Sequence, residues 1–298
     1  MPRTVTVGVD GSPESLTAAD WAAREAELWG RPVRLVHAGP WQPFAAAGEG
    51  HGGGPEVEAA RRRWAQRVLR ETTERLTAGR PGLRVTFEQV RETPVSALLD
   101  AASHGCPLVL GSRVVGGPDG REDVWLLGPV TLAVVAGASG PVVLARSPAV
   151  PELAGSTGVP GPSWDGAPSP HVVLGVDPRR PATGAVAFAF GEAARRHARL
   201  EAVHAWRRPP GADPARDREL EREAGQALRE VLAPWRARHP TVRVTVRTGF
   251  GAAASRLVDA AADASLLVVG RGGAPGRIGG VTRTVLRHCG TSVAVVPG

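Results

Sequence analysis

Four short segments, each directly after an apolar run, contain the residue types best suited to bind a ligand in this chain. Asp10–Ser12 and Asp177–Arg179 each begin with a carboxylate, and glycine-rich stretches begin at Gly111 and at Gly270. Glycines between a strand and a helix let backbone N–H groups approach a phosphate, which also meets the positive end of the helix dipole. The same glycines are equally suited to a tight turn with no ligand. The aspartates have two possible roles, binding a ribose hydroxyl or capping the next helix.

Other reactive side chains form weaker patterns. His37 and His204 occupy matching places, but no second histidine, cysteine or carboxylate keeps a metal-ligand spacing with them, so we predict a structural role and no metal site. Cys106 and Cys289 do not match each other, although His288 beside Cys289 leaves a dyad as an alternative. Nothing combines a nucleophile, a base and an orienting partner, so we expect a protein without efficient catalytic turnover.

The net positive charge suggests binding to nucleic acid, but the amino-acid composition argues against this interpretation. The chain has 36 basic and 29 acidic residues, a net charge of +7. All of the basic residues are arginine, while lysine, asparagine and tyrosine are absent, as a GC-rich genome would produce. The arginines alternate with acidic residues rather than forming one tract, so we expect solvated helix faces and no nucleic-acid partner.

Compartment is also constrained by the sequence. Two cysteines cannot build a disulfide framework, which favours a reducing environment. No stretch approaches the roughly 18 apolar residues of a membrane span. The first residues do not resemble a targeting signal. We therefore expect a cytoplasmic protein with no membrane partner.

The chain consists of two copies of one sequence. Val5–Asp10 reappears as Val172–Asp177, and Val36–Ala38 reappears as Val203–Ala205, both 167 residues later. Later segments repeat at offsets of 159 and then 151, in the same order, so each step of eight is a loop deletion in the second copy. We predict a first domain at 1–147, a Pro/Gly-rich linker at 148–169 and a second domain at 170–298.

Each copy alternates short apolar strands with helical patterns, which is typical of a parallel sheet covered on both faces. Five strands per copy predict two tandem doubly wound, Rossmann-like α/β domains. In such sheets a ligand binds beyond the carboxyl ends of the strands, which is where the four segments above lie. The expected strands are Val5–Asp10, Arg34–His37, Leu83–Val90, Leu108–Leu110 and Pro141–Ala145, then His171–Asp177, Ala202–His204, Thr241–Thr248, Ser265–Val269 and Ser292–Val296.

These motifs together resemble the universal stress protein family. Val7–Ser12 before an alanine-rich helix, Val36–Ala38, and Leu110–Arg113 before a glycine-rich stretch carry the resemblance, which extends over both copies. It implies a strand order of 3-2-1-4-5 and association through the last strand. In one subset of the family it also implies binding of ATP or AMP, with Mg²⁺ accompanying ATP.

The first copy departs from that subset's phosphate motif. Val114 stands where the motif has its second glycine, and Gly128 lies 17 residues after Gly111, four more than the motif has. Pro129 then replaces a hydroxyl residue and removes a backbone donor. This copy therefore lacks part of the phosphate site.

The second copy keeps more of the donors. Gly270 and Gly273 preserve the first half of the motif, whereas Gly279 follows Gly270 after only nine residues. Gly280 keeps its N–H but has no hydroxyl, which we expect Thr282 to supply in part. The resemblance implies nucleotide contacts from the strand-end aspartates, their neighbours and the glycine-rich turns, namely Asp10, Gly11, Ser12, Val36, Gly111, Ser112 and Gly128 in the first copy and Asp177, Val203, Gly270, Gly273, Gly279, Gly280, Val281 and Thr282 in the second.

Two functions of different classes follow. The first is a stress-response or signalling module that binds ATP or AMP in one or both crevices. The alternative is an interaction or scaffold protein whose pockets are degenerate and whose last-strand edges make the contacts. Tandem copies also raise the effective concentration of the two last strands, so we expect an internal pseudo-dimer, with a homodimer as a further possibility.

Overall fold

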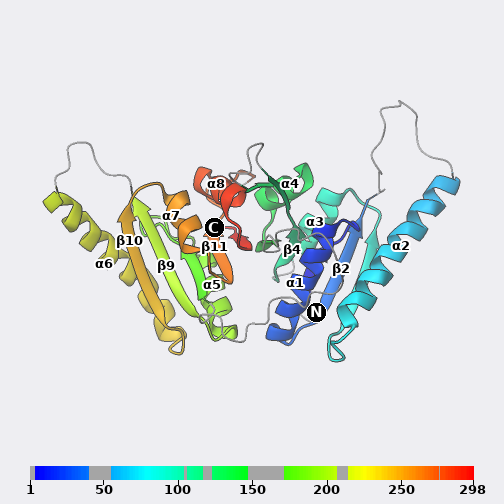
Figure 1. Cartoon of the computed structure of the whole chain (residues 1–298), viewed down its shortest axis with the longest axis horizontal. Helices are drawn as coiled ribbons and strands as arrows, with labels where there is room; N and C mark the ends of the chain where they lie inside the picture. The colour runs from blue at the N-terminus through cyan, green and yellow to red at the C-terminus, as the bar shows by residue number, and fades with distance from the viewer. Residues whose placement is uncertain are drawn as a thin grey trace. The chain divides into compact units, whose positions relative to one another are not determined.

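The computed structural model describes residues 4–39, 55–103, 106–116, 123–146, 171–206, 214–274 and 276–298. The chain forms two compact units, the first from residues 1–146 and the second from most of the remainder (Figure 1). The predicted linker, 148–169, lies outside the described residues. Within the described ranges, no helix combines the length and the apolar character needed to cross a bilayer.

The first unit is a parallel five-stranded sheet with its first strand at the centre. β1 pairs with β2 on one side and with β4 on the other, β2 pairs with β3, and β4 pairs with β7. This is the predicted order 3-2-1-4-5. The elements are β1 (Val5–Gly8), α1 (Pro13–Trp29), β2 (Val33–Ala38), α2 (Pro55–Thr77), β3 (Val85–Val90), α3 (Pro94–Ala102), β4 (Leu108–Gly111), β5 (Arg113–Gly116), β6 (Asp123–Leu126), α4 (Pro129–Gly137) and β7 (Val142–Ala145).

The second unit repeats this topology. β8 lies between β9 and β11, β9 pairs with β10, and β11 pairs with β12, all in parallel. The predicted duplication is confirmed, because the second copy of the first strand is central in its own sheet. The elements are β8 (His171–Gly175), α5 (Thr183–Arg195), β9 (Arg199–Trp206), α6 (Pro214–Arg238), β10 (Val244–Phe250), α7 (Ala253–Ala260), β11 (Leu266–Gly270), α8 (Gly280–His288) and β12 (Val293–Val296).

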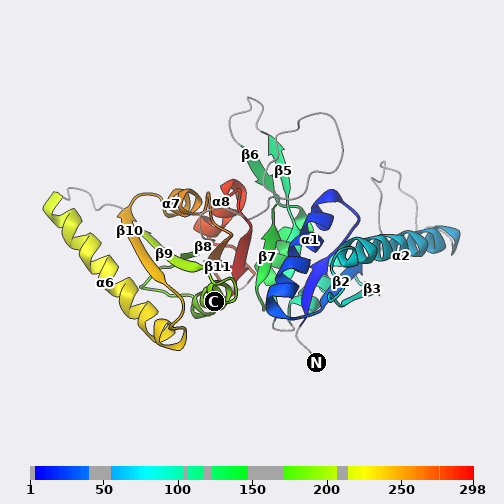
Figure 2. The ribbon, with the colours of Figure 1, turned by 60° about the horizontal axis from the view of Figure 1, so that its bottom comes forward.

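Helices cover both faces of each sheet, as the alternating pattern requires. In the first unit α1 and α2 contact each other over one face, and α3 and α4 contact each other over the other (Figure 2). In the second unit α5 pairs with α6 and α7 pairs with α8 in the same way. The central strands are therefore buried on both sides: the residues of β1 from Val5 to Val7 and of β8 from His171 to Leu174 are at most 3% exposed, including the polar Thr6 and His171.

The sheets and helices meet closely at a matching glycine in each central strand. A Cβ on Gly8 would lie 3.0 Å from a methyl carbon of Leu98 in α3, and a Cβ on Gly175 would lie 3.1 Å from Leu257 in α7. Both central strands end at this glycine, two residues earlier than the predicted ends at Asp10 and Asp177. Each aspartate consequently belongs to the turn that follows its strand.

One element of the first unit was not predicted. We expected a loop between β4 and α4, but β5 and β6 form an antiparallel hairpin there, which extends away from the sheet in Figure 2. Gly111 and Gly128 are 17 residues apart, whereas Gly270 and Gly279 are nine apart. The second step of eight between the repeats therefore falls in the segment that contains this hairpin. Trp125 of β6 is buried, and the Arg146 guanidinium carbon lies 4.6 Å from its ring centre.

A cross-strand ion pair occurs in both units with its charges exchanged. In the first unit Arg34 of β2 pairs with Glu88 of β3. In the second, Glu201 of β9 pairs with Arg247 of β10, with 2.9 Å between Oε1 and Nε. Each residue lies at the repeat offset from its counterpart of opposite charge. Both residues of the pair differ in charge between the repeats, and the opposite charges remain paired, which indicates that this ion pair forms in both sheets.

This exchange predicts the behaviour of single and double variants. Arg34→Glu places two carboxylates together, and we expect it to lower the free energy of unfolding by about 0.2–1 kcal/mol, the usual range for an exposed pair. Adding Glu88→Arg recreates the arrangement of the second unit and should restore that loss. Urea unfolding of the four proteins in the cycle measures the coupling. A double variant that is no more stable than the sum of its single changes would contradict the pairing.

Candidate functional site

The candidate sites lie at the topological switch point of each sheet, where the strand order reverses direction. This point is at the carboxyl ends of β1 and β4 in the first unit and of β8 and β11 in the second. At this edge Gly111 packs directly on the first turn of α1, because a Cβ there would lie 2.3 Å from the Glu14 carbonyl oxygen. Gly270 packs in the same way beside Ala182, at the start of α5, where an added Cβ would lie 2.8 Å from the alanine Cβ. In each unit the turn after the first strand and the turn after the fourth strand are therefore neighbours.

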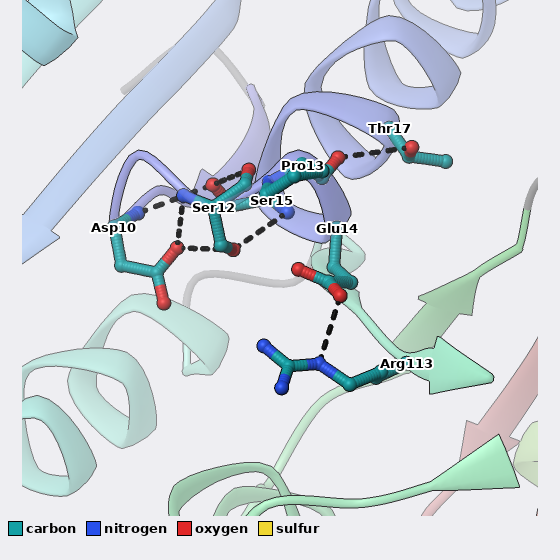
Figure 3. Close-up of polar contacts among 7 residues, drawn as sticks. All are labelled: Asp10, Ser12, Pro13, Glu14, Ser15, Thr17 and Arg113. Atoms are coloured by element: carbon teal, nitrogen blue, oxygen red, sulfur yellow. Dashed lines mark hydrogen bonds and ion pairs between the residues drawn. The ribbon is translucent and has the colours of Figure 1, made fainter. Parts of the chain in front are cut away.

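The turn after β1 is closed by its own hydrogen bonds (Figure 3). The Asp10 Oδ1 accepts from the Ser12 N–H at 3.0 Å and from the Ser12 hydroxyl at 2.6 Å. The Ser12 hydroxyl oxygen also accepts from the Ser15 N–H at 3.2 Å, which makes Ser12 the N-cap of α1. Of the two roles considered for Asp10, helix capping belongs to its neighbour, and Asp10 holds that neighbour in place.

Charge in this first site is largely balanced. Figure 3 shows the Arg113 side chain reaching from β5 to Glu14, where its Nε donates to Oε1 at 2.9 Å. Burial opposes ionisation of Asp10, but the hydrogen bonds from Ser12 and Ser15 outweigh it and hold the pKa of the carboxyl below its ordinary value. An anionic ligand bound here would therefore face the carboxylates of Asp10 and Glu14, while the guanidinium of Arg113 already has Glu14 as its partner.

The capping arrangement predicts a measurable loss in Ser12→Ala. We expect the free energy of unfolding at neutral pH to fall by about 0.5–2 kcal/mol because α1 loses its N-cap. The pKa of Asp10 should rise toward its ordinary value, since the variant lacks the hydroxyl that stabilises the carboxylate. A carboxyl whose pKa is lowered by folding adds stability above its unfolded pKa, and this contribution disappears as the pH falls below about 4. The variant should therefore lose less stability on acidification.

Urea unfolding at several pH values and a carbon-detected NMR titration of Asp10 measure both effects. Thr17→Ala is the matched control, because the Thr17 hydroxyl only donates back to the Pro13 carbonyl at 3.1 Å and its loss should change stability by less than about 0.5 kcal/mol. If Ser12→Ala left both stability and the Asp10 pKa unchanged, the capping role would be wrong.

The histidines of the second strands have a structural contact in both units. The His37 Nδ1 lies 2.8 Å from the Val9 carbonyl oxygen, and the His204 Nδ1 lies 2.9 Å from the Val176 carbonyl oxygen. The valine before each histidine is buried: Val36 is 1% exposed and Val203 is 4% exposed. Their carbonyl oxygens accept from the N–H of Val9 and of Val176. These valines are thus part of the sheet core beneath the crevice.

An aromatic ring lies on each of these histidines, and each ring comes from a different element. Trp64 of α2 contacts His37 edge-on, with ring centres 5.5 Å apart. Trp206, at the end of β9, stacks on His204 with ring centres 6.1 Å apart. Sequence reasoning did not single out Trp64, because a tryptophan on a charged helix gives no signal of what it covers.

The turn after β8 differs from its counterpart in charge. Asp177 Oδ1 accepts from the Arg179 N–H at 3.0 Å, so the aspartate again organises the turn. Arg179 and Arg180 then occupy exposed positions just before α5, whose N-cap Ala182 has no side-chain hydrogen bond to offer. Because Gly270 lies against Ala182, these arginines adjoin the glycine-rich turn.

That turn leads tightly into α8. Gly272 and Gly273 have φ values of 60° and 82°, which favour glycine. The Gly279 N–H donates to the Arg271 carbonyl at 3.0 Å, and the Arg271 N–H donates to the Val296 carbonyl at 2.7 Å. Gly279 is the N-cap of α8 and makes no side-chain cap.

The first N–H groups of α8 lie outside its hydrogen-bond ladder. The first bond within the helix runs from the Arg283 N–H to the Gly279 carbonyl, so the N–H groups of Gly280, Val281 and Thr282 precede it. Gly280 and Val281 are exposed. Thr282 is 4% exposed and its hydroxyl donates to the Gly270 carbonyl at 2.8 Å, so this hydroxyl supports the turn.

The equivalent turn of the first unit has fewer donors. Gly128 is the N-cap of α4 with φ −62° and ψ 160°, nearly the values of Gly279, but Pro129 follows it and has no N–H. Ser112 is 7% exposed, with its hydroxyl donating to the Ala145 carbonyl at 3.4 Å. The structure therefore places the two glycine motifs at matching sites and leaves the fuller set of donors in the second unit.

Comparison with known proteins identifies relatives over nearly the whole chain. The model of the universal stress protein family matches residues 1–146 and again residues 169–297. A universal stress protein of Mycolicibacterium smegmatis is 33% identical, with 98% of this chain and 96% of that protein covered. One from Mycobacterium tuberculosis is 34% identical with the same coverage. A crystal structure of a universal stress protein from Archaeoglobus fulgidus has a TM-score of 0.67 at 17% identity, covering 99% of this chain and 98% of that one.

Proposed function

This chain belongs to the universal stress protein family, and we propose that its second repeat binds an adenine nucleotide, ATP or AMP. The family consists of stress-response modules, and the proposal gives this member one ligand site. The nucleotide binds without efficient turnover, so that occupancy of the site is the signal. The first repeat serves as a structural partner within the same chain.

The observation that carries this proposal is the start of α8. Gly280 and Val281 present N–H groups that the helix itself does not use, at an exposed N-terminus with no side-chain cap. Phosphate oxygens accept such hydrogen bonds and are attracted by the helix dipole. The absence of side chains at Gly272, Gly273 and Gly279 lets a phosphate approach the backbone.

The charges around the second site favour an anion as well. Arg179 and Arg180 precede α5 at exposed positions, and Arg277 is exposed in the glycine-rich turn. In the first site the guanidinium of Arg113 is paired with Glu14. Arginine binds phosphate through several N–H donors at once, so a nucleotide is expected to prefer the second site.

The nucleoside end would lie toward Asp177, His204 and Trp206, which meet at the carboxyl ends of β8 and β9. Asp177 retains acceptor capacity for ribose hydroxyls beyond its one bond to the Arg179 N–H. Mg²⁺ brought with ATP would be held chiefly by phosphate oxygens and water, as is usual for this ion. We propose binding without turnover because the groups at the phosphate end of this site are donors that hold phosphates, while the carboxylate of Asp177 lies toward the nucleoside end.

Equilibrium dialysis with radiolabelled ATP and AMP tests the proposal directly. We expect saturable binding of one nucleotide per chain, weakened as salt is added because the arginines contribute through charge. A lack of saturable binding at millimolar nucleotide would overturn it and favour a scaffold protein with degenerate pockets. Pairing of the two last strands into an internal pseudo-dimer stays a prediction from the tandem sequence.

A further inference from the structure

We propose that Trp64 is a built-in occupant of the first repeat's crevice, whose indole takes the place of a nucleobase and limits the chain to one nucleotide. This inference rests on the proposed function for its ligand class, while its evidence is the packing of Trp64 in the first repeat and the replacement of that residue in the second. It assigns a specificity role to a residue of α2, outside the strand-end turns that form the candidate sites.

The position of the indole is defined by two contacts on neighbouring strands. A Cβ added to Gly11, in the turn after β1, would lie 2.9 Å from Cζ2 and 3.0 Å from Cη2 of Trp64. His37, near the end of β2, meets the ring edge-on, and its imidazole is held by the Val9 carbonyl. The indole therefore lies across the carboxyl ends of two adjacent strands, the edge at which a sheet of this kind binds its ligands.

The space between the Trp64 indole and the turn at Gly11 is too narrow for a second aromatic ring. An aromatic base stacked on a protein surface needs about 3.5 Å of separation from the atoms on each side of it. The indole already lies so near Gly11 that even an added Cβ would be 2.9 Å from it, and the φ of 83° favours glycine at that position. A base could reach this part of the turn only if the indole moved away.

The second repeat changes both members of this contact. The buried positions of the two long helices have the same spacing, with Ala65, Val68 and Thr72 in α2 matching Gly225, Leu228 and Leu232 in α6. The residue before the first of these is Trp64 in α2 and Ala224 in α6, so Ala224 is the counterpart of Trp64. Pro178 likewise stands in place of Gly11.

The glycine and the tryptophan thus occur together in one repeat and are both replaced in the other. The ring that lies on His204 comes instead from Trp206, at the end of β9. Ala224 offers no ring, so α6 has no aromatic side chain at the position from which Trp64 covers the turn of the first repeat. The two crevices are therefore expected to differ in whether a base can enter.

Counting bound adenosine in wild-type protein and in Trp64→Ala tests this inference. Adenosine has the base and ribose but no phosphate, so the donors that the first repeat lacks are not needed. We expect equilibrium dialysis with labelled adenosine to give one equivalent per chain for the wild type and two for Trp64→Ala. Trp235→Ala is the matched control: Trp235 lies near the opposite end of α6 and stacks on Phe190, and its removal should leave one equivalent.

The outcomes separate the two proposals. One equivalent in both wild type and Trp64→Ala would overturn the role of Trp64 and leave the proposed function standing. None in the wild type but one in the variant would support Trp64 as the occupant and would show that base and ribose alone do not bind the second repeat, whose nucleotide binding is tested by dialysis with ATP and AMP. None in either, or two in the wild type, would overturn the role of Trp64. If Trp64→Ala does not show a native circular dichroism spectrum, Trp64→Leu, which keeps an apolar side chain, takes its place with the same expected counts.

Discussion

Gly280→Pro is expected to weaken ATP binding by about 10- to 100-fold while leaving the protein folded. The substitution removes one N–H at the start of α8, and a hydrogen bond to a charged group contributes about 1.5–3 kcal/mol. Proline is favoured at the first position of a helix, where its φ fits and its N–H is not needed by the helix. The chain itself contains this arrangement, because Pro129 follows Gly128 with nearly the same backbone angles that Gly279 has.

Gly280→Ala is the control for this prediction. An added Cβ at Gly280 would meet nothing within 4 Å, and alanine keeps the N–H. We expect ATP to bind Gly280→Ala as it binds the wild type in isothermal titration calorimetry, and both variants to unfold at the wild-type temperature. Equal affinities for Gly280→Pro and Gly280→Ala would show that this amide does not contact the nucleotide.

Gly111→Ala is expected to cost about 1–3 kcal/mol of unfolding free energy, the range for forcing extra atoms into a packed site. Its Cβ would lie 2.3 Å from the carbonyl oxygen and 2.4 Å from the carbonyl carbon of Glu14. These are backbone atoms of α1, so the helix has to move away from β4. Urea unfolding measures the loss.

Gly128→Ala makes the same chemical change in the same unit without the clash. Nothing lies within 4 Å of an added Cβ at Gly128, and its φ of −62° suits any residue. Its stability should fall by no more than about 1 kcal/mol, the difference between glycine and alanine at an N-cap. The packing of Gly111 against α1 would be contradicted if the two variants were equally stable.

The fold could be predicted from the sequence because the same alternation of strands and helices occurs twice. Strand ends were less accurate: β1 and β8 end two residues before Asp10 and Asp177. The β5–β6 hairpin was missed because Arg113–Gly116 and Asp123–Leu126 are strands of only four residues each. Two signals could have indicated it: the turn motif Pro118, Asp119 and Gly120 between the two strands, and the step of eight between the repeats.

The site was predictable as a set of turns but not in its details. The glycines and aspartates identify the ends of the strands, and the topology brings those ends together. The sequence could not say that the Ser12 and Thr282 hydroxyls bind within their own turns, because such bonds depend on rotamers. Nor could it reveal Trp64, whose contact with Gly11 joins segments 53 residues apart through the packing of α2.

The central claim is that a nucleotide binds at the start of α8 and not at the start of α4. Titration of ¹⁵N-labelled protein with ATP, followed by amide chemical shifts in transverse-relaxation-optimised NMR spectra, tests it residue by residue. We predict the largest shifts at Gly272, Gly273, Gly280 and Val281, with little change at Val130 and Thr131 of the first repeat. Large shifts confined to the first repeat, or none at the start of α8 at saturating ATP, would contradict it.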